Sequence, residues 1–275
     1  MRLLSLRHSV AGVFLLSLLV AACSQPVTFV HMTDPQIGFR DRISPFGQSD
    51  TLMQKAVVAA NGLKPDVVFI TGDLIDNPDD SLQYAIFARN LATLEMPVLL
   101  VPGNHDMLGY SPERRENYLK LRGYDRFSRR VRDCVFIGID TNCIKEGDEE
   151  AEEAQWDWLT QELASARKTR GVRHIFLFVH CPIVRESLDE PEDYFNFSME
   201  KRSRYLGLLK EYGVEAVFAG HTHCDYHATV DGIDLYTGNP AGNVLKHGRT
   251  GIYLIRVNRD GLEVTFVPTT GDSAQ

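Results

Sequence analysis

The chain has 275 residues, of which 44% are hydrophobic and 24% charged, and its formal net charge is −8 at pH 7. This length and apolar content suit one globular α/β domain, although two small domains would also fit. The acidic balance excludes generic binding to nucleic acid, because the summed field repels phosphate backbones. A phosphate group handled by this protein must therefore be neutralised locally, for example by a metal ion.

The N-terminus predicts an export signal that is not part of the fold. Arg2 and Arg7 precede the apolar run VAGVFLLSLLVAAC, which is short for a transmembrane helix but suits a secretory signal. The end of this run, VAAC, resembles the lipobox of bacterial lipoproteins, in which the cysteine becomes the first residue and is acylated. We therefore expect a lipoprotein signal peptide over residues 1–22, a mature domain over 23–270 and lipidation at Cys23.

An ordinary signal peptide, cut after Ala22, is the alternative. Ser24 follows the cysteine, and by resemblance to Gram-negative lipoproteins a residue other than Asp here favours the outer membrane. We expect an exported protein that is lipid-anchored to the bacterial envelope. Because both charges of the leader are arginines, its removal changes the net charge from −8 to −10. Four further cysteines remain, and their spacing fits no disulfide framework.

The mature domain alternates short apolar strands with helices. Strands are predicted at VTFVHMT, DVVFITGD, PVLLVPGNHD, DCVFIGIDT, HIFLFVHCP, VEAVFAGHTH, YHATVDG, IDLYTG, GIYLIRV and LEVTFVP. Helices are predicted over residues 50–61, 81–94, 149–167 and 199–212, the second capped by Ser81. The acidic run EGDEEAEEAQ favours a helix start, because acids complement the positive end of the helix dipole. Apolar strands separated by helices indicate sheets covered by helices.

Polar residues follow the strands at one edge. They are Asp34, Asp73, Asn104 with His105, His180, and His221 with His223. In open α/β sheets ligands bind at this edge, because rigid strands hold loops that converge there. Each of these residues alone is weak evidence for a metal site. A lone Asp after a strand is usually a helix cap, and a lone His in an apolar setting is usually a hydrogen-bonded core residue. Together they supply mixed oxygen and nitrogen donors, and Asp73 in TGDLID can bridge two metal ions through its two oxygens.

These blocks resemble the calcineurin-like metallophosphoesterases over essentially the whole mature chain. The family pattern is D-x-H, G-D-x-x-D, G-N-H-D/E, a lone His after a strand, and G-H-x-H. Here the chain reads DPQ at 34–36, GDLID at 72–76, GNHD at 103–106, FVHCP around His180, and GHTH at 220–223. The resemblance implies a four-layer αββα sandwich, an α/β fold with two mixed sheets flanked by helices. It also implies a dinuclear metal site at the C-terminal edge of the strands.

The resemblance also implies a role for each residue. The expected metal ligands are Asp34, Gln36, Asp73 and His223 for one metal, and Asp73, Asn104, His180 and His221 for the other. His105 corresponds to the general acid, and Asp76 is expected to orient it. The implied reaction is hydrolysis of phosphate esters by a metal-activated hydroxide, with His105 protonating or stabilising the leaving group.

Gln36 departs from the family, because the common residue at this position is His. Its side-chain carbonyl is a hard, neutral oxygen donor, so we expect two divalent ions that favour oxygen, Mn²⁺ or Mg²⁺, with iron or zinc as alternatives. Gln36 could instead bind only water. DPQ together with YFNF at 194–197 resembles a subgroup that includes a human cytosolic calcineurin-like phosphoesterase domain protein, described as a serine/threonine phosphatase. In purple acid phosphatases a tyrosine ligand stands where this chain has Asp76, so a ferric tyrosinate centre is disfavoured.

We expect a monomeric phosphatase that acts on phosphomonoesters, either small molecules or phosphoproteins. A phosphodiesterase acting on nucleotide or lipid-type diesters is the first alternative, and a non-catalytic metal-binding envelope lipoprotein is the second. A paired, non-ligand His105 argues against the second, since metal binding alone has no use for it. Four loop residues are weaker candidates for substrate contact, namely Tyr194, Asn196, Asn239 and Asn243.

Overall fold

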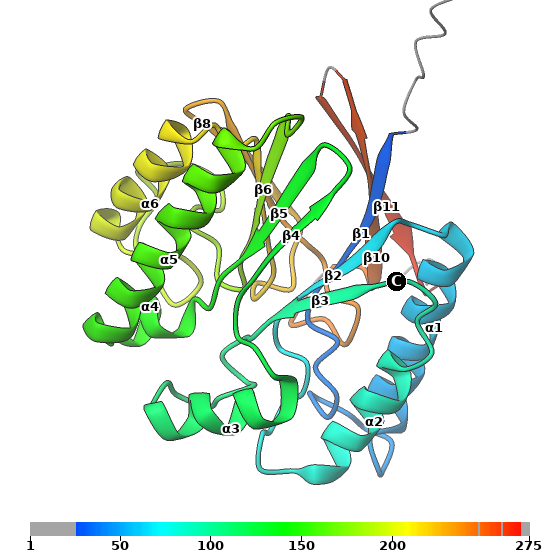
Figure 1. Cartoon of the computed structure of the whole chain (residues 1–275). Helices are drawn as coiled ribbons and strands as arrows, with labels where there is room; N and C mark the ends of the chain where they lie inside the picture. The colour runs from blue at the N-terminus through cyan, green and yellow to red at the C-terminus, as the bar shows by residue number, and fades with distance from the viewer. Residues whose placement is uncertain (1–25, 247, 260, 271–275) are drawn as a thin grey trace, which may run out of the picture.

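The protein, described by a computed structural model over residues 26–246, 248–259 and 261–270, folds as two β-sheets packed face to face (Figure 1). The strands are β1 (Val27–Met32), β2 (Val67–Thr71), β3 (Val98–Val101), β4 (Phe127–Val131), β5 (Cys134–Gly138), β6 (His174–Phe178), β7 (Ala216–Ala219), β8 (Tyr226–Val230), β9 (Ile233–Thr237), β10 (Gly251–Asn258) and β11 (Gly261–Pro268). The helices are α1 (Gly47–Leu63), α2 (Ser81–Leu91), α3 (Pro112–Arg122), α4 (Asn142–Glu146), α5 (Glu149–Lys168) and α6 (Met199–Glu211).

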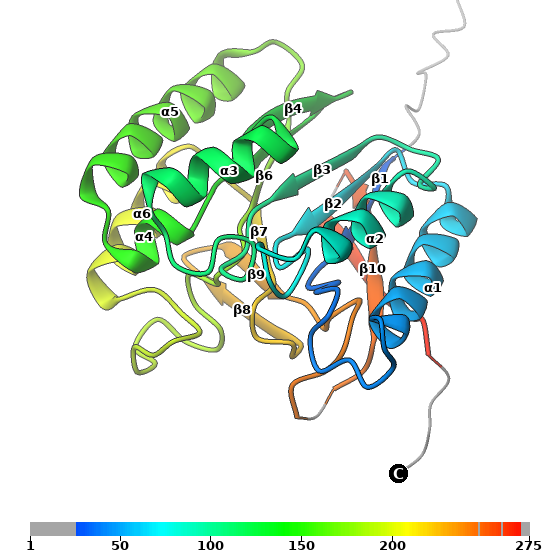
Figure 2. The ribbon, with the colours of Figure 1, turned by 90° about the horizontal axis from the view of Figure 1, so that it is seen from below.

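Both sheets are mixed, as expected. The five-stranded sheet has the order β11-β10-β1-β2-β3, and the six-stranded sheet has the order β4-β5-β6-β7-β9-β8. In the first sheet β1, β2 and β3 are parallel, and in the second β5, β6, β7 and β9 are parallel. Helices α1 and α2 cover the outer face of the first sheet, and α4, α5 and α6 cover that of the second (Figure 2). The predicted four-layer α/β sandwich is confirmed.

An aromatic layer fills the space between the sheets. It consists of inward-facing phenylalanines that are at most 1% exposed, including Phe29, Phe69, Phe136, Phe176, Phe178 and Phe218. Phe29 of β1 meets the rings of Phe136 and Phe218 edge to face, with centroid distances of 5.3 Å in both cases. Because both faces of these strands are buried, their sequences read as continuous apolar runs with little alternation. This rigid layer fixes where the strand ends, and hence the polar loops, lie.

The structure corrects one prediction of local structure, the cap of α2, and adds a short helix. The N-cap of α2 is Asp80, whose carboxylate accepts hydrogen bonds from two backbone amides, and Ser81 is the first helical residue. The short helix α4 was not predicted. The acidic start of α5 is confirmed, with Asp148 as its cap. Cys134, Cys143 and Cys181 are buried free thiols.

The leader lies outside the described residues. The predictions of a signal peptide over 1–22 and of lipidation at Cys23 concern that segment, so the structure leaves both as predictions. Among the residues that the structure describes, no helix has the length and apolar content needed to cross a membrane.

Candidate metal centre

The loops after β1, β2, β3, β6 and β7 carry the polar residues singled out in the sequence. These loops converge at the edge where the parallel strands end, the lower edge of the molecule in Figure 1. Two groups of buried side chains meet there, with potential ligand atoms within 4.8 Å of one another. One group is Asp34, Asp73 and His223, and the other is Asp73, His180 and His221. Asp73 belongs to both, as a bridging carboxylate must.

Asn104 completes the second group. Its Oδ1 lies 2.9 Å from Nε2 of His180, and its Nδ2 donates to the hydroxyl of Tyr194 at 2.8 Å. The ring of Tyr194 lies against that of His221, with a centroid distance of 4.7 Å. Asn104 therefore directs its carbonyl oxygen, a possible metal donor, toward the imidazole nitrogen of His180.

Backbone carbonyls fix the orientation of the three histidines. Nδ1 of His180 lies 2.8 Å from the carbonyl of Thr71, and Nδ1 of His223 lies 2.7 Å from that of Asn243. Nε2 of His221 lies 3.1 Å from the carbonyl of Tyr194. Because a carbonyl can only accept, each of these nitrogens carries the proton. In the neutral imidazole the other ring nitrogen is unprotonated, which is the form that binds a cation.

The amide of Gln36 has one satisfied end and one unsatisfied end. Its Nε2 donates to Oδ1 of Asp76 at 3.2 Å, which points the carbonyl the other way. The carbonyl oxygen Oε1 is buried and has no hydrogen-bond partner among the described residues. A buried oxygen without a partner is costly unless something binds it. Gln36 lines one cavity together with Asp73 and His223, so a cation held by this group would satisfy the orphan oxygen.

The ligand loops are held in unusual backbone conformations. Asp34, Gln36, Asp73, His221 and His223 all have positive φ, between 35° and 72°. Non-glycine residues rarely adopt this region, and they do so mainly where function requires it.

Glycines let these strained loops pack closely. Gly72 has φ of 80°, and a Cβ added to it would lie 2.5 Å from Nδ1 of His180. A Cβ at Gly220 would collide with Oγ1 of Thr33 and would lie 2.6 Å from Oδ2 of Asp34. The glycines of GDLID and GHTH are thus required by the geometry of the centre.

His105 lies beside the two groups and is half-buried. Its backbone amide donates to Oδ1 of Asp73 at 2.9 Å, and its Nδ1 lies 3.1 Å from both the carbonyl and Oδ1 of Asp76. Burial alone would lower the pKa of His105, but the hydrogen bond to Asp76 and the charge of Asp73 outweigh it and raise that pKa to about 9. No described residue hydrogen-bonds Nε2 of His105, so this ring nitrogen is available to a substrate atom.

Two clamps were not predicted from the sequence. Asp106, the last residue of GNHD, accepts hydrogen bonds from the amides of Leu74 and Gly103 at 2.9 and 2.7 Å and so ties the second and third loops together. Thr33 donates to Oδ2 of Asp34. Asp106 and Leu74 are 32 residues apart in the chain, so no local pattern in the sequence indicates the first clamp.

The weaker candidates for substrate contact divide into two pairs. Tyr194 lines the cavity, and the carbonyl of Asn243 holds His223. Asn196 instead bonds Glu190 and Asp193 within its own loop, and Asn239 bonds Tyr253. The cavity itself has a volume of about 230 Å³ and an aromatic rim that includes Phe39, Tyr194 and Phe195. A second hollow of about 160 Å³ adjoins it, beside Lys145 and Asn104.

Comparisons with known proteins agree with this geometry. Residues 27–225 match the family model described as calcineurin-like phosphoesterase. The human serine/threonine-protein phosphatase CPPED1 is 30% identical over 257 residues, which cover 86% of this chain and 81% of the human protein. A probable glycerophosphodiester phosphodiesterase, GpdQ of Arcobacter nitrofigilis, is 29% identical over 163 residues, which cover 58% of this chain and 57% of that protein.

Among solved structures, a dimetal phosphatase from Danio rerio has the same fold, with a TM-score of 0.69 at 14% identity over 90% of this chain and 98% of that one. With the two side-chain groups that share Asp73, these similarities establish a centre for two divalent metal ions.

Proposed function

Because the chain belongs to the calcineurin-like phosphoesterase family, and is therefore a metal-dependent hydrolase of phosphoric esters, we propose that it acts mainly as a phosphomonoesterase. The observation that carries the proposal is the position of Asp73 in both side-chain groups, with His105 held against it. A pair of cations that shares a carboxylate, next to a protonated imidazole, suits attack on phosphorus and release of an alcohol.

We assign Asp34, Gln36, Asp73 and His223 to one cation, and Asp73, Asn104, His180 and His221 to the other. The unpartnered oxygen of Gln36 and the protonated outer nitrogens of the histidines support this assignment. The bound cations supply Lewis acidity, which makes water a nucleophile near neutral pH and neutralises phosphoryl charge. Because Gln36 contributes oxygen in place of a second imidazole, we assign Mn²⁺ or Mg²⁺ to the site in preference to zinc or iron.

His105 supplies the proton in this proposal. Its Nδ1 is held by Asp76, so the free Nε2 is the atom that donates to the leaving-group oxygen. The high pKa keeps the imidazole protonated at neutral pH, and divalent cations near Asp73 would lower the pKa toward the range that is efficient for a general acid. Asp76 is a positioning residue, because it binds both His105 and the amide of Gln36.

A panel of phosphomonoesters and phosphodiesters, assayed with Mn²⁺, Mg²⁺, Zn²⁺ and iron, tests the proposal. We expect the highest kcat/KM for monoesters with Mn²⁺ or Mg²⁺. A higher kcat/KM for diesters would establish the second candidate, phosphodiesterase activity, which the similarity to GpdQ of Arcobacter nitrofigilis favours. The named substrate class of CPPED1 makes phosphoserine and phosphothreonine peptides suitable members of the panel.

The cellular location is a separate proposal. The sequence of the leader supports export and lipidation at Cys23, with the domain held at the outer membrane of a Gram-negative envelope. In that location the substrate would be a phosphorylated molecule outside the cytoplasm, and a monomer suffices because each chain holds a whole metal centre.

A further inference from the structure

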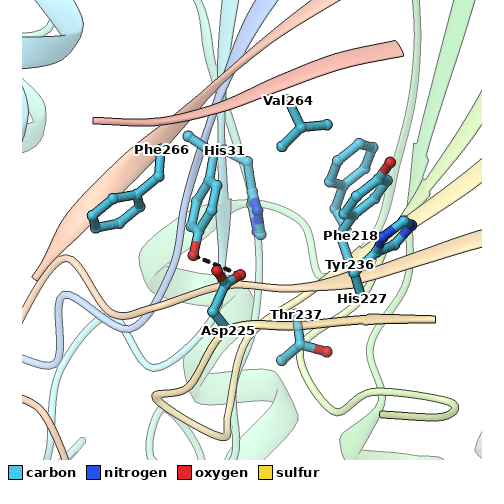
Figure 3. Close-up of a pocket in the computed structure, with 10 residues that line it drawn as sticks. His31, Phe218, Asp225, His227, Tyr236, Thr237, Val264 and Phe266 are labelled. Carbon is cyan, nitrogen blue, oxygen red and sulfur yellow. Dashed lines mark hydrogen bonds between the residues drawn. The ribbon is translucent and has the colours of Figure 1, made fainter. Parts of the chain in front are cut away.

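A second pocket, of about 210 Å³, opens between the two sheets at the side away from β3 and β4 (Figure 3). Side chains from β7, β8 and β9 form one wall, and side chains from β10 and β11 form the other. This pocket shares no lining residue with the cavity of the metal centre or with the hollow beside it. It is therefore a separate site.

Stacked rings make up the first wall. The imidazole of His227 lies on the ring of Tyr236, with centroids 4.3 Å apart and planes 3° from parallel. Tyr236 in turn stacks on Phe218 at 5.3 Å and 13°. On the opposite wall Tyr253 packs against Phe266 at 5.1 Å, and Figure 3 shows Val264 above the space between the walls. A space bounded by aromatic rings on both sides suits a planar apolar ring.

The floor of the pocket contains a polar atom without a partner. His31 of β1 is only 1% exposed and lines the pocket. Its Nε2 is bonded to Oγ1 of Thr71 at 2.8 Å, whereas no described residue hydrogen-bonds its Nδ1. An unpaired nitrogen in so buried a ring is a position that a ligand or an enclosed water would satisfy.

Asp225 places a negative charge at the mouth. Its Oδ1 lies 3.0 Å from the hydroxyl of Tyr253. The backbone amide and Nδ2 of Asn239 both donate to that hydroxyl oxygen at 2.9 Å, so its hydrogen is directed at Asp225. The carboxylate is thus held in place through one oxygen, and no described residue donates a hydrogen bond to the other.

We propose that this pocket binds a small organic cation: an apolar ring carrying an ammonium group, with the ring between the aromatic walls and the ammonium at Asp225. Aromatic faces attract cations, and the free carboxylate oxygen adds a direct ion pair. The ring of an anionic compound of the same size would pack between the same walls, but its charge would meet the repulsion of Asp225. The pocket therefore selects by charge as well as by shape.

The test uses three small compounds that share a benzene ring and carry a positive, a neutral and a negative group: benzylammonium, benzyl alcohol and benzoate. Their binding to the purified protein is measured by calorimetry. We expect saturable binding of one benzylammonium per chain, roughly tenfold weaker binding of the alcohol, and still weaker binding of benzoate. Equal affinity for all three compounds, or preference for benzoate, would overturn the proposal.

Two variants of the pocket and one control variant separate binding in the pocket from nonspecific binding. Val264→Trp fills the space between the walls and should lower benzylammonium affinity at least tenfold. Val58→Trp, which adds the same ring to a 71% exposed position on α1, is the matched control and should bind as the wild type does. Asp225→Asn keeps the shape and removes the ion pair, so it should reduce the preference for the ammonium over the alcohol to what the aromatic faces alone provide. If Val264→Trp does not fold, the Asp225→Asn result alone decides: an unchanged preference refutes the proposal.

Discussion

At Gln36 an amide oxygen stands where the related family pattern has an imidazole, and that buried oxygen has no partner within the described part of the chain. If it binds a cation, Gln36→His should raise the affinity for Zn²⁺ at that position and shift the metal that gives peak activity. Gln36→Ala should weaken one of the two metals by about tenfold or more, since even outer-shell losses cost about 10–100-fold. Metal titration with parallel activity measurement would detect both effects. If both variants bind the same number of metal ions as the wild type and prefer the same metal, Gln36 is not a ligand.

His105 and Asp73 are in contact, but replacing one should affect metal binding and activity differently from replacing the other. His105→Ala removes a proton donor and should lower kcat by about 10²–10⁴-fold while the metal content stays near that of the wild type. Asp73→Asn replaces the carboxylate shared by both groups with a neutral amide, so metal and activity should be lost together. Metal analysis of the two purified variants, with kinetics at saturating metal, distinguishes them. Equal loss of metal would mean that His105 belongs to the ligand set.

The sequence predicted these residues because each lies directly after an apolar strand, and parallel strands bring their ends to one edge. The structure brings all seven predicted ligand positions together at that edge. The protonated nitrogens of the histidines could not be predicted in the same way. Their partners are backbone carbonyls such as that of Thr71, which is 109 residues from His180. A carbonyl is present at every residue and therefore leaves no signal in the sequence.

At the scale of elements, a buried cation helps to hold the loop between β6 and α6. The guanidinium of Arg202 is fully buried and donates to the carbonyls of Phe197 and Glu190 and to two others in that loop. Arg202→Met leaves these carbonyls without donors and should lower the free energy of unfolding by about 3 kcal/mol or more. Lys120→Met removes only an exposed i,i+4 pair with Glu116 and should cost less than ~0.5 kcal/mol.

Urea denaturation of both variants measures the difference. Because Tyr194 lies in the loop that Arg202 holds, we also expect Arg202→Met to raise KM more than Lys120→Met does. Equal unfolding free energies in the two variants would mean that Arg202 does not hold the loop.

The loop after β5 links the two sheets through Asp140. Its Oδ1 accepts from the amide and Nδ2 of Asn142 at 2.8 Å, and Nδ2 of Asn142 also donates to the carbonyl of Gly103. Oδ2 of Asp140 is buried and has no hydrogen-bond partner among the residues that the structure describes, and burial raises the pKa of Asp140 to about 7. Among its charged neighbours, Asp125 raises this pKa further and Arg115 lowers it.

This pKa predicts how stability changes with pH. The folded state keeps the Asp140 proton up to about pH 7, whereas the unfolded chain loses it near pH 4. The folded state therefore binds more protons between these values, and its stability falls as the pH rises through this range. Asp140→Asn cannot titrate, so its stability relative to the wild type should increase from pH 4 to pH 7, by up to ~4 kcal/mol. Urea denaturation at several pH values gives both profiles, and parallel profiles would contradict the assigned proton.

Element boundaries and packing were predictable to different degrees. Strands such as β2, β5 and β7 were found because their apolar runs are fully buried, and α5 because its acids mark its start. The short helix α4 was not predicted, because five residues are too few to show a helical pattern of apolar residues. The aromatic pocket could not be foreseen either, since its walls come from the edges of two different sheets, whose pairing depends on the whole fold.

For the whole molecule, the direction of β1 decides how an anchored protein would face its surroundings. Asp34 follows the end of β1, and Pro26 precedes its start, so the two ends are about 20 Å apart at the usual rise of a strand. The carbonyl of Pro26 accepts a hydrogen bond from Arg132 in the turn between β4 and β5. The segments 126–132 and 167–173 contain eight Lys and Arg and no acid, and Arg130 of the first donates to the carbonyl of Arg170 in the second.

If Cys23 is acylated, only Ser24 and Gln25 separate the lipid from Pro26, a span of roughly 10 Å even when extended. The basic segments would then lie next to the phospholipid headgroups, and the metal centre would open away from the membrane toward soluble substrates. In a Gram-negative host we expect the wild-type protein to sediment with membranes and to resist a high-salt wash, because the lipid and not the charge provides the anchor. Cys23→Ser should release the protein or leave it unprocessed. Recovery of wild-type protein as a soluble, unlipidated periplasmic species would reject the anchor.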